Sequence, residues 1–170
     1  SLIFIFIVFI RKKITKKVSF NIPVVCVGNV YIGGTGKTPT SIQIANQIIK
    51  SGNKPAILRK FYKNHEDEYG LIRNNFDNLI LDSDRVDGIR KIEKLKFDIA
   101  ILDDGLQDYR ITKNLNIVCF NSNQLVGNGL ILPSGPLREN LSTLKDADII
   151  IINGVKNKSF EKKLLSINEN

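Results

Sequence analysis

The chain has 170 residues, of which 42% are hydrophobic and 25% charged, a balance typical of one globular domain. This composition excludes a disordered or collagen-like chain and a disulfide-rich mini-protein, and no stretch has the roughly 20 apolar residues needed for each helix of a polytopic membrane protein. The formal net charge of +8 favours anionic partners such as phosphorylated small molecules, nucleic acid or anionic lipid.

The first feature along the chain is an apolar run, Leu2–Ile10, directly followed by a basic cluster. As a helix this run would cover about 13–14 Å, too short to cross a hydrocarbon core of about 30 Å. Basic residues beside an apolar helix favour a membrane interface or the end of a longer hydrophobic helix; a buried helix or strand is the alternative. We therefore predict a membrane-associated N-terminal helix with its basic flank over residues 1–20, followed by one folded unit over residues 21–170. The basic cluster consists of Arg11, Lys12, Lys13, Lys16 and Lys17.

From Pro23 onward, short apolar runs alternate with amphipathic stretches. Helical spacing predicts helices over Pro39–Lys50 and from a cap at Ser83 to about Lys96. Strands that alternate with helices and are apolar on both faces indicate an α/β fold, with a mostly parallel sheet and helices on both faces. The Gly- and Pro-rich segment Asn121–Asn140 is predicted to be a functional loop. The predicted strands are Val24–Val27, Pro55–Leu58, Leu79–Leu81, Phe97–Leu102, Asn116–Phe120 and Asp148–Ile152.

A glycine-rich segment joins the first predicted strand to the first predicted helix. Glycines in this position let backbone N–H groups turn toward an anion, and the helix N-terminus adds the positive end of its dipole. Lys37 would supply a charge for the phosphates and Thr38 a hydroxyl for Mg²⁺. Tyr31 stands where the strict pattern has its first glycine, so the loop is a variant, and a simple strand-to-helix turn is the alternative. The predicted nucleotide-binding residues are Tyr31, Ile32, Gly33, Gly34, Thr35, Gly36, Lys37 and Thr38.

Two acids, Asp103 and Asp104, directly follow the predicted strand Phe97–Leu102. In a doubly wound sheet, groups at the carboxyl end of a strand beside the phosphate-binding strand face the nucleotide. A carboxylate in this place can hold Mg²⁺, and both acids can reach a metal beyond the strand end. The alternative is a solvated acidic turn.

Several motifs occur in the order found in one kinase family. They are Gly28-Asn29, Gly33–Pro39, Asp103–Gln107, Gly127–Glu139 and Asn153-Gly154, and together they resemble the tetraacyldisaccharide 4′-kinase family. The resemblance implies a P-loop kinase of two lobes that uses ATP and Mg²⁺ to phosphorylate the 4′-hydroxyl of a tetraacyldisaccharide 1-phosphate, giving lipid IVA in lipid A biosynthesis. It also implies a place at the cytoplasmic face of the bacterial inner membrane. The expected partners are ATP, the acylated disaccharide lipid and the membrane surface, without nucleic acid.

The resemblance implies roles for single residues. Gln107 is similar to a metal-site residue of the family, beside Thr38, Asp103 and Asp104, and Asp67 resembles the carboxylate that activates the sugar hydroxyl with a His of the second lobe. The register of Asp67 runs through a shortened segment, so an exposed loop carboxylate is the alternative. Lys37 and Asp67 are the predicted catalytic residues.

The sequence departs from the family pattern in several places. Leu58-Arg59-Lys60-Phe61 retains only the Arg and an aromatic residue of the usual Ser-Arg-Gly-Tyr, and Asp108 replaces a common His. His65 is interpreted as a surface residue. The second lobe is absent from the sequence, which also contains no methionine, so we expect a fragment that binds Mg²⁺ and ATP weakly and phosphorylates nothing alone.

Two other protein classes share parts of this pattern. A partitioning-type ATPase has a similar glycine-rich loop but a Lys before the glycines, where this chain has Ile32. A nucleotide-gated GTP-binding module would need an Asn-Lys-x-Asp motif to read the base, and Asn157-Lys158-Ser159-Phe160 lacks the acid. Both readings remain as alternatives to the lipid kinase.

Overall fold

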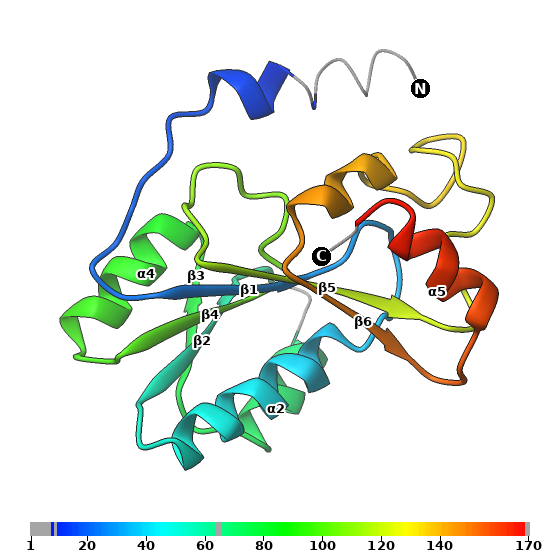
Figure 1. Cartoon of the computed structure of the whole chain (residues 1–170). Helices are drawn as coiled ribbons and strands as arrows, with labels where there is room; N and C mark the ends of the chain where they lie inside the picture. Colours follow the sequence, from blue (N-terminus) through cyan, green and yellow to red (C-terminus); the bar gives the residue numbers. More distant parts are fainter. Residues whose placement is uncertain (1–7, 9, 64–65, 169–170) are drawn as a thin grey trace.

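A sheet of six parallel strands lies at the centre of the computed structural model, which describes residues 8, 10–63 and 66–168 (Figure 1). The strand order is β3-β2-β4-β1-β5-β6, and all five neighbouring pairs are parallel. The predicted α/β fold with a parallel sheet is therefore confirmed. The strands are β1 (Val24–Gly28), β2 (Pro55–Lys60), β3 (Leu79–Asp82), β4 (Ile99–Asp103), β5 (Leu115–Asn121) and β6 (Ile149–Asn153).

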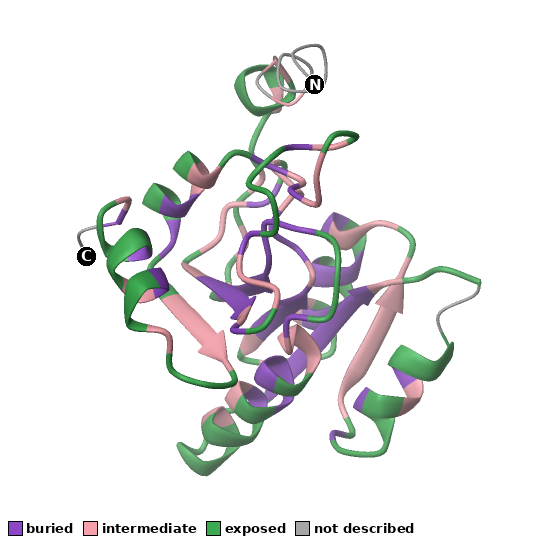
Figure 2. Ribbon diagram, turned by 90° about the vertical axis from the view of Figure 1, so that its right-hand side faces the viewer, coloured by how far each residue is buried: buried purple, intermediate pink, exposed green. Residues whose placement is uncertain are grey.

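Helices cover both faces of this sheet, as the sequence predicts. On one face lie α2 (Lys37–Lys50) and α3 (Glu66–Arg73), and on the other lie α4 (Arg85–Lys94), the 3₁₀ helix η1 (Leu141–Asp146) and α5 (Lys158–Leu165). Figure 2 shows the buried residues concentrated on the inner strands of the sheet and on the helix sides turned toward them, whereas the two outer strands are of intermediate burial. The sheet thus separates two hydrophobic cores, which fix the positions of the loops at its edge.

The central strand β1 supplies both cores. Val25 and Val27 pack in the core with α2, whereas Val24 and Cys26 pack in the core with α4 and α5. This division follows from the period of two in a strand, which points successive side chains to opposite faces. Because β1 is completely buried between β4 and β5, the loop at its carboxyl end starts from a rigid base.

Two helix starts differ from the prediction. Helix α2 begins at Lys37 and not at Pro39, so the glycine-rich loop leads directly into its first turn. Helix α4 is capped by Asp84, whose Oδ1 accepts hydrogen bonds from the backbone N–H of Val86 at 2.8 Å and of Asp87 at 3.4 Å. The predicted cap at Ser83 is wrong because the chain stays extended through Asp84 before it enters the helix.

Three short elements, α3, η1 and α5, were not predicted from the sequence. Each buries only one or two apolar side chains, such as Tyr69 and Ile72 in α3 or Phe160 and Leu164 in α5. So few apolar residues give no clear helical period along the chain.

The predicted N-terminal helix falls mostly outside the described residues, as does His65. Residues 10–14 are helical, and Val18 joins the body of the protein by a bridge to Ile111, with its backbone N–H 2.7 Å from the Arg110 carbonyl oxygen. Within the described part of the chain, we find no helix with the length and apolar character needed to span a membrane. The membrane-associated segment over residues 1–20 stays a prediction.

Candidate functional site

The glycine-rich loop lies at the carboxyl edge of the sheet, between β1 and α2. Gly36 occupies the N-cap of α2 with φ of 79°, and no side chain among the described residues caps this helix end. A left-handed conformation at this point favours glycine, and it turns the chain so that the first N–H groups of α2 lack intrahelical partners. An uncapped helix start of this kind can bind an anion such as phosphate.

Four side-chain amides donate hydrogen bonds to backbone carbonyls of the loop, and one of them, Asn29 Nδ2, makes a long contact of 3.4 Å with the Gly33 carbonyl. Asn121 Nδ2 donates to the Gly34 carbonyl at 3.2 Å, Gln124 Nε2 donates to the Ile32 carbonyl at 3.0 Å, and Asn153 Nδ2 donates to the Thr35 carbonyl at 2.7 Å. Asn121 and Asn153 are the last residues of β5 and β6, and Gln124 belongs to the predicted functional loop. By binding the loop carbonyls, these amides leave the opposite N–H side of the peptide units to a ligand.

These contacts also explain why the loop needs its glycines. A Cβ atom on Gly36 would lie 2.6 Å from Asn153 Nδ2, and one on Gly33 would lie 2.8 Å from Gln124 Oε1. Sequence reasoning identified the glycines and placed Asn153 in a family motif, but it gave Asn121, Gln124 and Asn153 no role at the loop, since nothing in the loop itself points to residues about 90 to 120 positions away.

The two residues before the glycines have different environments. Tyr31 is fully buried against the Phe120 ring, and its hydroxyl accepts a hydrogen bond from the Asn121 backbone N–H at 2.8 Å. Its side chain therefore supports the loop from the core. Ile32 is 50% exposed at the start of the loop.

Lys37 lies among groups of both signs at the open side of the loop. Burial lowers the pKa of Lys37, and the nearby carboxylates of Asp104 and Asp103 oppose this effect. Burial disfavours the charged form of Asp104, but the positive charges of Lys37 and Arg138 outweigh it and hold the pKa of this carboxyl below its ordinary value. The site thus keeps an ammonium group and a carboxylate close to where phosphates would lie.

The two consecutive acids point to different partners. Asp103 Oδ2 accepts a hydrogen bond from Thr38 Oγ1 at 3.0 Å, whereas Asp104 Oδ1 lies 3.1 Å from Arg138 Nη1. Asp104 has φ of 62°, a left-handed conformation that Asp tolerates better than most residues, and this turn separates the two carboxylates. Of the two acids, it is therefore Asp103 that contacts Thr38, the other residue predicted to bind Mg²⁺.

Asp103 is completely buried and has a partner at each oxygen. Ser41 Oγ donates to its Oδ1 at 3.1 Å, and its Oδ2 forms an ion pair with Arg59 as well as the bond from Thr38. Sequence reasoning missed Ser41 and gave Arg59 no role. Arg59 lies opposite Asp103 in the parallel register of β2 and β4, a pairing that only the strand order reveals.

Gln107 and Asp108 follow the acid pair in the same turn. Gln107 Nε2 donates to the Asn29 carbonyl at 2.9 Å, and its Oε1 accepts a long hydrogen bond of 3.4 Å from Arg138. Asp108, which replaces the family's His, forms an ion pair with Arg110 at 2.9 Å. Gln107 is thus near Asp104 through their common partner Arg138, and its role at a metal stays a prediction.

The donor atoms near Thr38 fit Mg²⁺ better than a metal that needs a full protein cage. Among the described residues, no group of three or more His, Cys, Asp or Glu side chains is arranged to hold a metal ion. Mg²⁺ usually takes one or two carboxylates, waters and substrate phosphates, and a hydroxyl oxygen and a carboxylate oxygen 3.0 Å apart match that chemistry.

Asp67 lies in the first turn of α3, exposed to solvent, with Glu66 and Glu68 as its neighbours. Its position in a helix differs from the loop carboxylate considered as an alternative. Glu68 is the member of this acidic run that reaches the site, because its Oε2 forms an ion pair with Arg59. The catalytic role of Asp67 stays a prediction.

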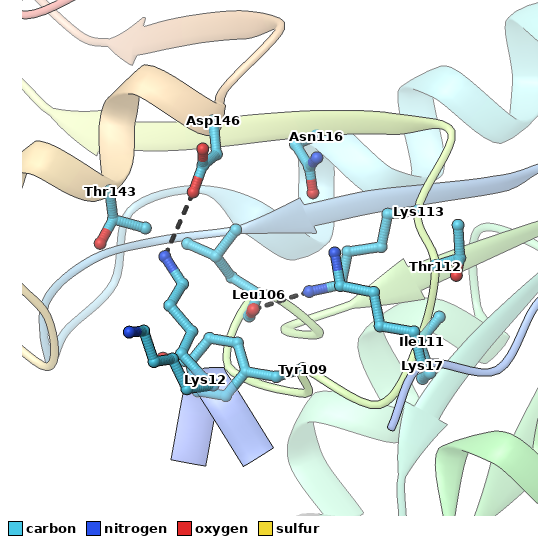
Figure 3. Close-up of a pocket in the computed structure, with 11 residues that line it drawn as sticks. Lys12, Lys17, Leu106, Tyr109, Ile111, Thr112, Lys113, Asn116, Thr143 and Asp146 are labelled. Carbon is cyan, nitrogen blue, oxygen red and sulfur yellow. Dashed lines mark hydrogen bonds and ion pairs between the residues drawn. The ribbon is translucent and has the colours of Figure 1, made fainter. Parts of the chain in front are cut away.

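A lysine-lined pocket of about 600 Å³ lies between the N-terminal segment and the turn after β4. Figure 3 shows Lys12 reaching toward Asp146, 3.2 Å away, and Lys113 reaching toward the Leu106 carbonyl oxygen, 2.7 Å away. Burial lowers the pKa of Lys113, although Cys26, Asp108 and Glu139 nearby oppose this effect. The pocket combines amine and apolar groups, a lining that suits an anionic amphiphile. Its other lining residues include Lys13, Lys17, Tyr109 and Ile111.

The family model described as tetraacyldisaccharide-1-P 4′-kinase, LpxK, matches residues 1–169. The chain belongs to this family. The tetraacyldisaccharide 4′-kinases of Pelagibacter ubique and Francisella philomiragia are 42% and 36% identical to it, over 92% and 88% of the chain. These matches cover 49% and 53% of the two relatives, so the chain spans about half the length of the curated relatives it matches.

A solved LpxK structure is similar in fold. The crystal structure of LpxK from Aquifex aeolicus in complex with ATP has a TM-score of 0.76 and 27% identity, and the match covers 89% of this chain and 56% of that one. Membership in the tetraacyldisaccharide-1-P 4′-kinase family confirms the resemblance read from the motifs. It disfavours both the partitioning-type ATPase and the GTP-binding module.

Proposed function

We propose that the protein transfers the γ-phosphoryl group of ATP to the 4′-hydroxyl of tetraacyldisaccharide 1-phosphate, giving lipid IVA. The observation that carries this proposal is the pairing of Thr38 with Asp103 at 3.0 Å beneath an uncapped, glycine-rich helix start. Such a site binds the phosphates of a nucleotide. Family membership supplies the acceptor class, because the relatives are named for this reaction.

On the ATP side, the chain supplies backbone N–H groups and one ammonium group. The loop amides and Lys37 would bind the β- and γ-phosphates and offset their negative charge. Preorganisation matters here because phosphoryl transfer depends mainly on positioning and on charge stabilisation. The amides of Asn121, Gln124 and Asn153 provide it by fixing the loop before nucleotide arrives.

Thr38 and Asp103 are the residues that would hold Mg²⁺, with Asp104 and Gln107 as further candidates. Once bound, the ion would neutralise charge on the phosphate oxygens. Asp104 and Gln107 share the partner Arg138, which thereby links them to the loop 121–140.

On the acceptor side, the 4′-oxygen would form a bond to the γ-phosphorus while the bond from that phosphorus to the bridging oxygen of ADP breaks. The hydroxyl proton would pass to Asp67 as the general base. A His from a second lobe would complete this base, as the resemblance implies.

The lysine-lined pocket would hold an anionic group of the acceptor lipid. Lys12, Lys17 and Lys113 line it beside apolar side chains, and it adjoins the turn that begins with Asp104. Residues 1–20 would contact the membrane surface, and the protein would lie at the cytoplasmic face of the bacterial inner membrane, as the resemblance implies. The acylated substrate would then reach the site from the bilayer.

The test is transfer of labelled γ-phosphate from ATP to tetraacyldisaccharide 1-phosphate by the protein in its full length. We expect Mg²⁺-dependent transfer that excess unlabelled ATP blocks and GTP does not. Lys37→Ala should abolish transfer, whereas Lys50→Ala, which removes an exposed Lys at the other end of α2, should retain it. Equal competition by GTP, or DNA-stimulated hydrolysis without a phosphorylated lipid, would contradict the proposal.

A further inference from the structure

The site contains a buried guanidinium that the proposed reaction does not use. Arg59 is 8% exposed and lies on β2 opposite Asp103 of β4. Its Nη1 donates to Thr38 Oγ1 at 3.1 Å and also to Asp103 Oδ2. These are the two oxygen atoms that we assign to Mg²⁺, so the guanidinium is bonded to the ion's own ligands.

A guanidinium and Mg²⁺ cannot use these oxygen atoms in the same way at the same time. Mg²⁺ requires oxygen ligands at about 2.0–2.1 Å in near-octahedral geometry, and an N–H group directed at the same lone pairs blocks that approach. The two cations also repel each other. A fully buried carboxylate nevertheless needs a positive partner, because an uncompensated buried charge is strongly destabilising. Arg59 therefore neutralises Asp103 for as long as no metal does.

The other side of the guanidinium leads to α3. Arg59 Nη2 donates to Glu68 Oε2, and Glu68 is the residue after Asp67, the predicted general base. The Glu68 side chain is 48% exposed, so it has room to move together with the guanidinium. A displacement of Arg59 from Asp103 would therefore also change its contact with Glu68 and could move α3, the helix that carries Asp67.

We propose that Arg59 is a positioning residue that occupies the Mg²⁺ position when nucleotide is absent. Entry of Mg²⁺ with ATP displaces its guanidinium from Thr38 and Asp103 toward Glu68, and this displacement shifts the first turn of α3. The inference rests on the proposed function, since it requires Mg²⁺ and ATP to bind at this site.

The first measurement is the Mg²⁺ affinity of the full-length protein at saturating ATP, by calorimetric titration. In Arg59→Gln the competing cation is gone, so Mg²⁺ should bind about tenfold more tightly, as expected when a charge-assisted hydrogen bond no longer has to be broken. Arg59→Lys retains a positive charge and should show a smaller gain. Arg90→Gln removes an exposed Arg that pairs with Asp87 on α4, and it should leave the affinity unchanged.

The second measurement is backbone hydrogen exchange in α3 before and after addition of Mg²⁺ and ATP. Exchange in residues Glu66–Arg73 should change in the wild type but not in Arg59→Gln or Glu68→Gln. A purely structural role of Arg59 would lower thermal stability in every state and would move neither Mg²⁺ affinity nor this exchange response.

Three results would overturn the inference while the proposed function stands: ATP binding with an unchanged or weaker Mg²⁺ affinity in Arg59→Gln, no exchange response of α3 in the wild type, or the same response in all variants. If Arg59→Gln does not fold, Arg59→Lys decides the question: a higher Mg²⁺ affinity than in the wild type supports the inference, and an unchanged or lower affinity overturns it. A wild-type protein that binds no ATP would overturn both proposals.

Discussion

Lys37 and Asp67 represent the two sides of the proposed transfer, and their environments differ. Lys37 is half-buried at the start of α2, where burial lowers the pKa of its amine against the opposing effect of Asp104. Asp67 is exposed in the first turn of α3, next to a residue bound to Arg59. Lys37 is therefore part of the proposed phosphate site, whereas the position of Asp67 depends on how α3 is placed.

The corresponding substitutions should fail in different ways. Lys37→Ala removes the charge that would face the phosphates in the proposed site, so nucleotide affinity and turnover should fall together. Asp67→Ala should lower kcat by about 10²- to 10⁴-fold, the usual contribution of general-base catalysis, with little change in KM for ATP. Steady-state kinetics of the full-length protein, with ATP and lipid varied separately, measures both effects.

Glu66→Ala is the matched control for Asp67→Ala. Glu66 lies in the same helical turn but pairs with the exposed Arg73 at 3.5 Å, whereas Glu68 pairs with Arg59. The Glu66→Ala variant should therefore retain near-normal turnover. Loss of turnover in Glu66→Ala together with normal turnover in Asp67→Ala would place the catalytic carboxylate at another position of this acidic run.

At the scale of elements, the sheet and α2 could be predicted from the sequence, whereas α3, η1 and α5 could not. Buried strands leave continuous apolar runs, and α2 follows a motif that marks its start. The unpredicted helices are short and bury one or two apolar side chains each, so tertiary packing, and not a sequence period, defines them.

The same distinction holds within the site. Lys37, Thr38 and Asp103 could be found because each belongs to a contiguous motif beside a predicted strand. Arg59 could not be assigned, because its contact with Asp103 depends on β2 lying beside β4 and not beside β1. Asn153 shows the same dependence, since its contact with Thr35 links residues 118 positions apart. Local spacing predicts motifs, but strand order determines which motifs meet.

Sequence reasoning predicted Ser83 as the N-cap of α4, whereas the structure has Asp84 in this position, and substitutions at the two residues can test the difference. Asp84→Ala should lower the free energy of unfolding by about 1 kcal/mol, the usual cost of losing an N-cap, whereas Ser83→Ala should change it by less than about 0.5 kcal/mol. Urea denaturation at neutral pH measures both values. Equal costs for the two variants would mean that Asp84 does not act as the cap in solution.

The loss of stability caused by Asp84→Ala should depend on pH, and the sign of this dependence follows from the pKa of Asp84. A hydrogen bond from Arg110 and the α4 backbone N–H groups hold the pKa of Asp84 below its ordinary value of 3.8, with burial opposing them. Its contribution is therefore fully present above about pH 3.8 and is lost as the pH falls through the lower folded-state value. The difference in the free energy of unfolding between wild type and Asp84→Ala should therefore become smaller in acid. A difference that becomes larger in acid would contradict this assignment.

At the scale of the whole molecule, the N-terminal segment lies against η1 and the turn after β4, the turn that begins with Asp104. Lys12 lies 3.2 Å from Asp146 of η1, and its ammonium group lies 5.7 Å from the centroid of the Tyr109 ring in the turn after β4. Figure 1 shows this segment above the same side of the sheet as η1 and that turn. A basic segment here can bind a membrane surface and keep the lysine-lined pocket close to it.

This arrangement predicts that charge at the N-terminal segment matters more for membrane binding than the same charge elsewhere. Replacing Lys13 and Lys16 by Gln should weaken binding of the full-length protein to vesicles with anionic lipid by about 30-fold, at about 1 kcal/mol per basic residue near the surface. Replacing the exposed Lys162 and Lys163 of α5 by Gln removes the same net charge and should have little effect. Vesicle sedimentation at low salt measures both affinities, and the difference should disappear at high salt, where charges separated by more than a few ångströms are screened. If both pairs of substitutions weaken binding equally, the net charge of +8 attracts the membrane without regard to position, and residues 1–20 do not form the contact.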